Sequence, residues 1–128
     1  MDYCESKTSL LGERLIHVGI TGAGTSAPTV RGGHGVTVTR TGTGVIKFSF
    51  VDNPGTFVGI RGYMFGADTP GDVKGYTVTR DTYTAPSGST KGFVEVSLWN
   101  SSFAAVDLGS GDEYLDITFA FSTLSRIT

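Results

Sequence analysis

Apolar and polar residues alternate along several short segments of the chain. The alternation is clearest over residues 114–122, where every second position is apolar: Leu115, Ile117, Phe119 and Phe121. Because successive side chains of a β-strand point to opposite faces, this pattern predicts a strand that buries one face in a core. The same period predicts further strands over residues 13–20, 36–41, 45–51, 56–65, 76–84 and 93–99, and a shorter one near 103–108.

Glycine and proline separate these segments. The loop Gly42-Thr43-Gly44 is short enough for a β-hairpin with a bulge, and Pro54-Gly55 is typical of a tight turn. Gly59 and Gly62 fall inside the fourth predicted strand, where they predict bulges or a close backbone approach. The Gly-rich stretch 21–34 is too long for a hairpin connection, so we expect a crossover or a functional loop there, at a contact surface.

One hexapeptide occurs twice. Residues 35–40, GVTVTR, return almost unchanged as residues 75–80, GYTVTR. The recurring residues favour strands and turns and include no nucleophile, base or metal ligand, so the repeat predicts a duplicated β-hairpin. Arg40 and Arg80 close the two copies. We expect them at equivalent strand ends, either solvated or paired with an aspartate across a subunit boundary.

Length and pattern together predict one domain. With 128 residues the chain can bury a single core, and no helical period of useful length interrupts the predicted strands. About eight short strands separated by turns are typical of an all-β, antiparallel, single-domain β-sandwich, jelly-roll-like in outline, which we assign to residues 13–128. Residues 1–12 are mostly polar apart from Leu10 and Leu11, so we expect an N-terminal arm that orders only against a partner.

Charge and composition argue against several kinds of partner. The formal net charge is −2 and no run of Lys or Arg occurs, so the sequence lacks the basic footprint of a protein that binds nucleic acid. The one cysteine, Cys4, has no partner for an intramolecular disulfide, which agrees with synthesis in a reducing cytoplasm. The sequence shows neither a leader peptide nor an apolar run of membrane-spanning length, so we expect no membrane association.

The residues that usually perform catalysis lack the spacing that catalysis requires. His17 and His34 are the two histidines, and neither has a cysteine, a carboxylate or another histidine at a metal-binding or triad-like spacing. The Gly-rich stretches are followed by no Lys-Ser or Lys-Thr pair and no helical pattern, which argues against phosphate binding. We therefore expect no enzyme, no cofactor and no metal ion.

Four aromatic residues allow two interpretations: Tyr63, Tyr76, Tyr83 and Trp99. Aromatic rings on an exposed face can stack on sugar rings, and Tyr83 and Trp99 are the candidates for glycan stacking. Aromatic residues in such positions also serve in cores and subunit interfaces, where they bury an apolar body and keep a polar tip hydrated.

One long run of the sequence resembles small virion proteins of tailed bacteriophages. The run is SAPTVRGGHGVTVTRTGTG over residues 26–44, and residues 75–80, 84–90 and 100–108 add to the similarity. The resemblance implies a structural component of the virion, in particular a capsid decoration or cement protein, which is typically a trimer clamped over junctions between capsomers. Such families lack catalytic residues, so the resemblance implies none here.

These observations lead to one main hypothesis and one alternative. A homotrimeric decoration protein would be made in the host bacterial cytoplasm and bind the major capsid protein on the virion surface, where several weak contacts add as avidity. We expect its contacts to come from the arm, the Gly-rich stretch and the ends of the repeats: Leu10, Leu11, Arg31, His34, Arg40 and Arg80. The alternative is a tail-fibre or head-fibre domain that binds carbohydrate receptors through Tyr83 and Trp99.

Overall fold

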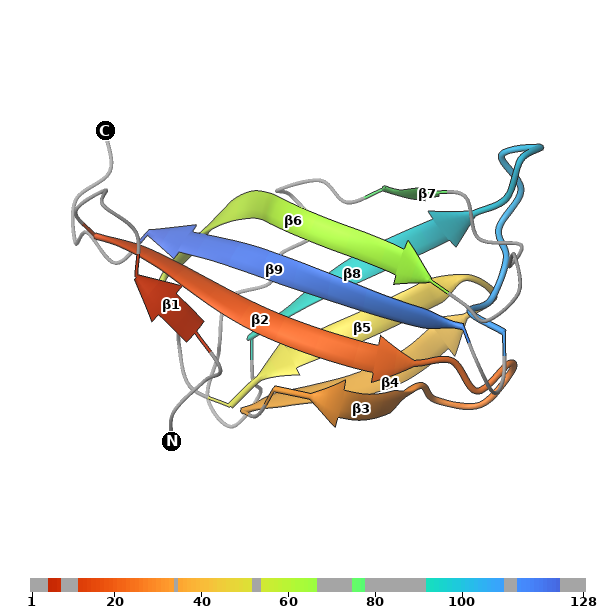
Figure 1. Ribbon diagram of the computed structural model, residues 1–128, viewed down its shortest axis with the longest axis horizontal. Helices are drawn as coiled ribbons and strands as arrows, with labels where there is room; N and C mark the ends of the chain where they lie inside the picture. The colour runs from red at the N-terminus through yellow and green to blue at the C-terminus, as the bar shows by residue number, and fades with distance from the viewer. Residues whose placement is uncertain are drawn as a thin grey trace.

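The computed structural model describes residues 5–7, 12–33, 35–51, 54–66, 75–77, 92–109 and 113–122. Within these residues nine strands form two antiparallel sheets that pack face to face with their strands crossing at an angle (Figure 1). Sheet A consists of β1 (Glu5–Lys7), β2 (Glu13–Thr21), β3 (Thr29–Gly32), β6 (Thr56–Gly66) and β9 (Tyr114–Ser122). Sheet B consists of β4 (Val36–Gly42), β5 (Val45–Phe50), β7 (Gly75–Thr77) and β8 (Gly92–Trp99). The predicted all-β sandwich is confirmed.

Strand β9 is the centre of sheet A. It pairs along its length with β2 on one side and with β6 on the other, while β1 and β3 share the far edge of β2. The alternation predicted for this strand is confirmed, because its inward residues are all buried: Leu115, Ile117, Phe119 and Phe121. Asp116 and Thr118, which lie between them, point to the outer face of the sheet.

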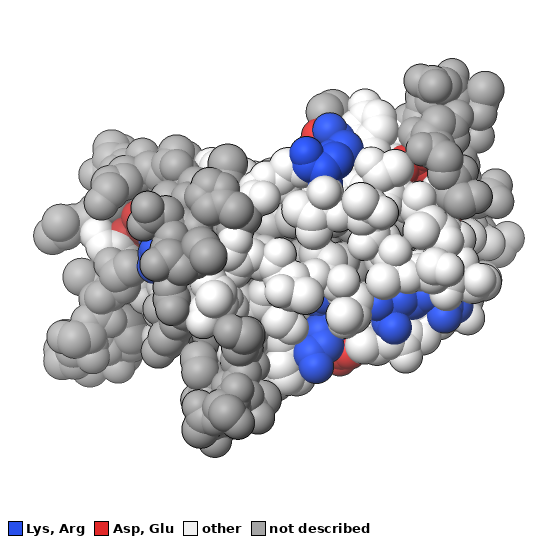
Figure 2. Space-filling model, turned by 90° about the horizontal axis from the view of Figure 1, so that it is seen from below, with Lys and Arg blue, Asp and Glu red and all other residues white. Residues whose placement is uncertain are grey.

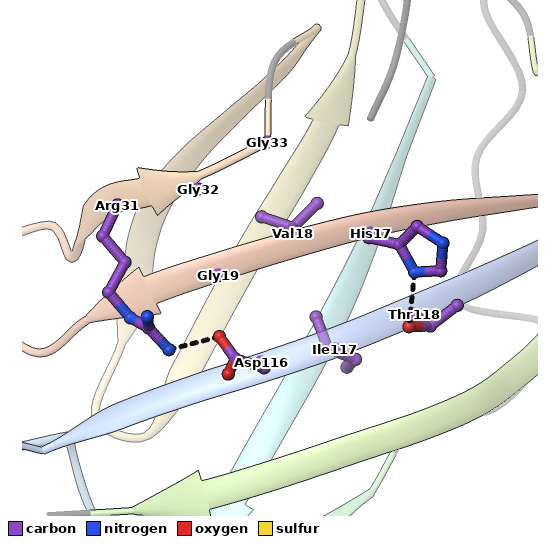
Figure 3. A pocket seen from close by; sticks show the side chains of 9 residues that line it. All are labelled: His17, Val18, Gly19, Arg31, Gly32, Gly33, Asp116, Ile117 and Thr118. Atoms are coloured by element: carbon purple, nitrogen blue, oxygen red, sulfur yellow. Dashed lines mark hydrogen bonds and ion pairs between the residues drawn. The ribbon is translucent and has the colours of Figure 1, made fainter. Parts of the chain in front are cut away.

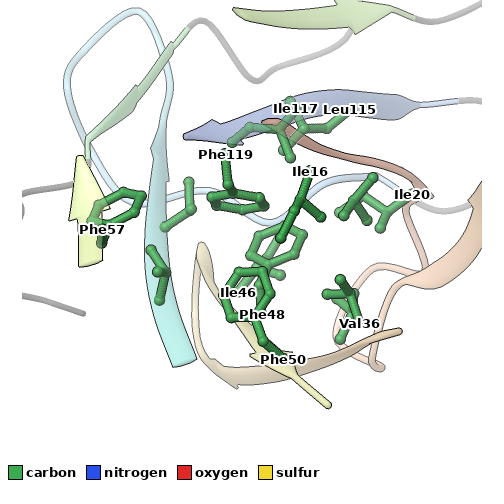
Figure 4. Close-up of a cluster of buried hydrophobic side chains, with 14 of the residues drawn as sticks. Ile16, Ile20, Val36, Ile46, Phe48, Phe50, Phe57, Leu115, Ile117 and Phe119 are labelled. Atoms are coloured by element: carbon green, nitrogen blue, oxygen red, sulfur yellow. The ribbon is translucent and has the colours of Figure 1, made fainter. Parts of the chain in front are cut away.

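Five phenylalanine rings fill the middle of the sandwich: Phe48, Phe50, Phe57, Phe119 and Phe121. Phe119 stands edge-on to Phe48 and Phe50, with ring centroids 5.0 and 5.5 Å apart (Figure 4). Edge-to-face contacts set the positive edge of one ring against the negative face of another. Burying each ring contributes roughly 1.5–3 kcal/mol. These rings hold sheet A against sheet B.

The two copies of the hexapeptide lie at opposite edges of sheet B, whose strand order is β4-β5-β8-β7. Each copy supplies an edge strand that pairs with the next strand along the chain, so Thr37 lies opposite Ser49 and Thr77 lies opposite Ser97. The inner strands β5 and β8 pair antiparallel in the middle. The strand order β4-β5-β8-β7 therefore places the described parts of the two copies at equivalent positions on either side of the central pair.

Glycines shape the turns and bulges at the predicted places. The β4–β5 hairpin has a register shift between Arg40 and Gly42, and Gly44 in its loop adopts a φ of 69°. Strand β6 contains two register shifts, one at each of the predicted glycines, Gly59 and Gly62. Both predictions of bulges are confirmed.

The segment 21–34 differs from the prediction of a single loop, because Thr29–Gly32 forms β3 and pairs with β2. The alternating signal is weak there, since Val30 is the one apolar side chain in β3. The register of this pair also shifts between Gly19 and Ile20, because Arg31 of β3 is an extra residue without a partner in β2. The connection is therefore a short loop over 22–28 followed by an edge strand.

Two further segments depart from expectation. Within the predicted arm, Glu5–Lys7 forms β1 on the edge of β2, so this part of the arm orders on the chain itself. The short strand expected near 103–108 is reduced to a single bridge between Ala105 and Trp99. Beyond Thr77, the second copy of the repeat lies outside the described residues.

Candidate functional site

The loop that follows β8 carries an exposed aromatic side chain. Phe103 is 79% exposed, and in Figure 1 this loop projects past the ends of the sheets. Its φ of 62° makes Phe103 the one residue other than glycine with a positive φ in the described part of the chain. A left-handed backbone costs a residue that has a side chain about 1–2 kcal/mol. The fold thus tolerates local strain at the position where it presents a large apolar ring.

Hydrogen bonds from Asn100 fix this loop. The side-chain oxygen of Asn100 accepts from the backbone N–H groups of Ser102 at 2.9 Å and Ala104 at 3.1 Å. Its backbone N–H donates to the carbonyl of Ala104 at 3.0 Å, and its carbonyl accepts from the N–H of Phe103 at 2.9 Å. Asparagine favours such turns because its side chain replaces a backbone partner. These bonds impose the left-handed conformation on Phe103.

Trp99 supports Phe103 from the end of β8. Their ring centroids are 5.2 Å apart with the planes tilted by 40°. The half-buried indole lies directly over Gly75 in β7, where a Cβ atom would overlap the ring. The glycine that opens the second copy of the repeat therefore makes room for Trp99. We call Trp99 and Phe103 the aromatic tip.

An ion pair anchors the base of the loop to the β4–β5 hairpin. Arg40 donates through Nε to Oδ1 of Asp107 at 2.9 Å and through Nη2 to Oδ2 at 3.0 Å. The backbone N–H of Gly44 donates to Oδ1 at 2.8 Å. The hydrogen bond from Arg40, helped by the one from Gly44, lowers the pKa of Asp107, and Asp107 in turn raises the pKa of Arg40. We expected Arg40 to be solvated or to pair with an aspartate of another subunit. In the structure it pairs with Asp107 of its own chain.

Arg31 lies on the outer face of sheet A. Its Nη2 donates to Oδ1 of Asp116, and its guanidinium lies 4.7 Å from the centre of the Tyr114 ring. The Arg31 side chain remains 42% exposed. Its role as a partner contact therefore stays a prediction, and its surroundings form a pocket described below.

The other predicted partner contacts lie outside the described residues: Leu10, Leu11, His34 and Arg80. The same holds for Tyr83, a candidate for glycan stacking. Of the two glycan-stacking candidates, the structure therefore places Trp99 alone, in the aromatic tip.

Sequence reasoning missed Phe103. The signal that could have found it is an aromatic residue inside Asn-Ser-Ser-Phe, a run of turn-forming residues directly after a strand. We interpreted this run only as part of a resemblance and a weak strand. Phe103 is exposed because hydrogen bonds from Asn100 fix the loop, and the alternation of apolar and polar residues does not predict such bonds.

One face of the molecule shows few charged groups among its described residues. On the face shown in Figure 2 most described atoms belong to uncharged residues, and the Lys and Arg side chains lie in separate groups. The described residues contain no group of three or more His, Cys, Asp or Glu side chains that could hold a metal ion. No helix among them is long and apolar enough to cross a membrane.

Comparison with known proteins gave no relative. No protein-family model matches the chain, and no curated protein or solved structure is significantly similar to it.

Proposed function

We propose that this chain is a structural protein of a bacteriophage virion, a capsid decoration protein that binds the outer surface of the major capsid lattice. The observation that carries the binding role is the strained, exposed Phe103 of the aromatic tip. The placement on a phage capsid rests on the resemblance of residues 26–44 to small virion proteins.

Apart from its contact with Trp99, Phe103 brings the isolated chain a cost in this arrangement. The backbone strain costs about 1–2 kcal/mol. Leaving the ring in water forgoes roughly 1.5–3 kcal/mol of burial. A partner with an apolar pocket would recover the burial term, and aromatic side chains that fill such pockets dominate many protein interfaces.

The tip is also prepared for binding before a partner arrives. Asn100 fixes the loop, and Arg40 with Asp107 fixes its base. Because the loop is already ordered, little conformational entropy is lost when Phe103 is buried in a complex. In a homotrimer three such tips would engage the lattice together and add their affinities as avidity.

The test is binding to capsids of the phage that encodes this chain, purified without it. Phe103→Gly should reduce occupancy at least about tenfold, because it removes a central apolar anchor. Ser101→Ala, a change at an exposed position of the same loop, serves as the matched control and should bind like the wild type. Full occupancy by Phe103→Gly would refute the role of the tip, and failure of the wild type to bind would refute the capsid placement.

One observation also favours the alternative of a carbohydrate-binding fibre domain. The two rings of the aromatic tip are neighboured by the hydroxyl and amide groups of Asn100, Ser101 and Ser102. Rings beside uncharged hydrogen-bonding groups are suited to stacking on sugars. Binding to a glycan array that disappears in Phe103→Gly, together with no binding to capsids, would favour this alternative.

A further inference from the structure

The outer face of sheet A carries a pocket of about 280 Å³ (Figure 3). Its lining residues come from the middle of β2 and β9, from β3 and from Gly33, which follows β3. The aromatic tip follows β8 in the other sheet, so the two sites share no residue. One predicted contact residue, Arg31, lines the pocket, but the proposed function does not account for the pocket itself.

Arg31 and Asp116 form one end of the pocket. In Figure 3 the Arg31 side chain reaches from β3 across β2 to Asp116 on β9. Gly19 lies beneath this pair, and a Cβ atom there would lie 2.6 Å from Oδ1 of Asp116. Glycine at position 19 therefore lets the ion pair lie flat across β2.

Both charged groups keep hydrogen-bonding capacity that faces the pocket. The Arg31 and Asp116 side chains are 42% and 39% exposed. Oδ2 of Asp116 and four of the five N–H groups of Arg31 have no hydrogen-bond partner among the described residues. The Tyr114 ring beneath the guanidinium holds Arg31 in place. One end of the pocket thus offers a fixed acceptor beside fixed donors.

The opposite end is lined by His17 and Thr118, whose Nδ1 and Oγ1 atoms are hydrogen-bonded at 2.9 Å. Gly33 has a φ of +97°, and a Cβ atom there would lie 2.7 Å from the carbonyl oxygen of His17. The positive φ and the short distance both require glycine at position 33. Because glycine has no Cβ atom, the backbone after β3 can lie close to β2. A second set of polar groups is thereby held across the pocket from the ion pair.

We propose that this pocket binds a single neutral sugar unit. Two neighbouring hydroxyl groups of a sugar ring can donate to Oδ2 of Asp116 and accept from the Arg31 guanidinium at the same time. The opposite charges of Arg31 and Asp116 offset each other, so neither an anion nor a cation gains net attraction. The volume of about 280 Å³ lies just below the range of ligand pockets, roughly 300–1,000 Å³, so one ring fits better than a chain of sugars.

The test is an NMR titration of ¹⁵N-labelled protein with glucose, galactose, mannose and N-acetylglucosamine, each added separately, with inorganic phosphate as the charged comparison. At least one sugar should shift the amide signals of Gly19, Gly32 and Gly33 in a saturable way, with a Kd on the order of millimolar because the contact is small. Phosphate should leave these signals in place. Shifts with phosphate and none with the sugars, or no shifts with any probe, would overturn the proposal.

Two variants locate the site and one serves as control. Gly32 pairs with Gly19 and has open space where its Cβ would be, so Gly32→Val should fold normally and obstruct the pocket. Asp116→Asn removes the charged acceptor and should weaken binding about tenfold. Ser97→Ala, at an exposed position of β8 in the other sheet, is the control and should bind sugar like the wild type. Sugar binding that survives in Gly32→Val but is lost in Phe103→Gly would place the ligand at the aromatic tip and overturn the proposal, whatever the outcome on capsids.

Discussion

Arg40 and Asp107 lie 67 positions apart in the chain and form a two-point ion pair, with Nε to Oδ1 at 2.9 Å and Nη2 to Oδ2 at 3.0 Å. The pair joins the end of β4 to the base of the loop that carries Phe103. Since the loop spans open solvent beyond the sheets, its orientation depends on such contacts at its base. A partly exposed contact at the end of an edge strand thus bears on the geometry of the candidate binding surface.

This ion pair predicts a specific acid sensitivity. The pKa of Asp107 in the folded protein lies below its ordinary value of 3.8. Asp107 therefore stabilises the fold fully above about pH 4, and this contribution is lost as the pH falls through the lowered pKa. Asp107→Asn should lower the melting temperature by a few degrees at neutral pH, and this difference should shrink as the pH falls through the lowered pKa of Asp107. A melting difference that is independent of pH would contradict this account.

The backbone strain at Phe103 predicts an unusual order of stabilities. Phe103→Gly and Phe103→Ala both remove the ring and its contact with Trp99, but only glycine accepts a positive φ without strain. Phe103→Gly should therefore be more stable than Phe103→Ala, by about 1 kcal/mol after the greater freedom of unfolded glycine is subtracted. Urea unfolding of both variants measures this difference. Equal stabilities would mean that the loop relaxes away from the left-handed conformation.

The packing of Trp99 on Gly75 predicts a fluorescence change. Trp99 is the one tryptophan of the chain, so its emission reports on the aromatic tip alone. Gly75→Ala should displace the indole, shift its emission to longer wavelength and lower the melting temperature, because a Cβ atom at position 75 overlaps the ring. Gly42→Ala is the matched control, since a Cβ atom there meets nothing within 4 Å. An unchanged spectrum in Gly75→Ala would contradict the described packing.

The phenylalanine core predicts a large loss of stability at Phe119. This side chain is completely buried and contacts Phe48 and Phe50 edge-on. Phe119→Ala should lower the free energy of unfolding by about 3–5 kcal/mol, and Phe119→Asp should not fold, because it buries an unpaired charge. Ser97→Ala on the exposed face of β8 should change little. A loss below about 1 kcal/mol in Phe119→Ala would be at odds with this packing.

The proposed trimer predicts the mass of the protein in solution. Size-exclusion chromatography with light scattering should give about three times the chain mass of 13.4 kDa. A monomer would remove the avidity on which the decoration hypothesis depends, and the glycan measurements would then take precedence.

The strands with regular alternation were predictable from the sequence because that signal is local. Strand β9 spans the same residues as its prediction, and β5 and β8 each differ by one residue at one end. Strand β3 was not predictable in this way, since it lies at a sheet edge and has a single apolar side chain, Val30, to mark its inner face.

The candidate sites were less predictable because their contacts are not local. Arg31 and Asp116 are 85 positions apart, and they meet only because β2 brings β3 and β9 to its two edges. The sequence shows that both residues are charged. That they form a pair follows from the strand order, which the sequence does not show. The left-handed conformation of Phe103 likewise depends on how Asn100 bonds within its loop.

The central place of β9 in sheet A has a consequence for biosynthesis. Strands β2 and β6 do not pair with each other, and each pairs with β9, which the ribosome makes after both of them. During translation the hairpin β4–β5 can form early, because its contacts are close in sequence, whereas sheet A must wait for the last of its strands. The nascent chain therefore passes through a period in which the apolar faces of β2 and β6 lack the strand that joins them, and it is most prone to aggregate then.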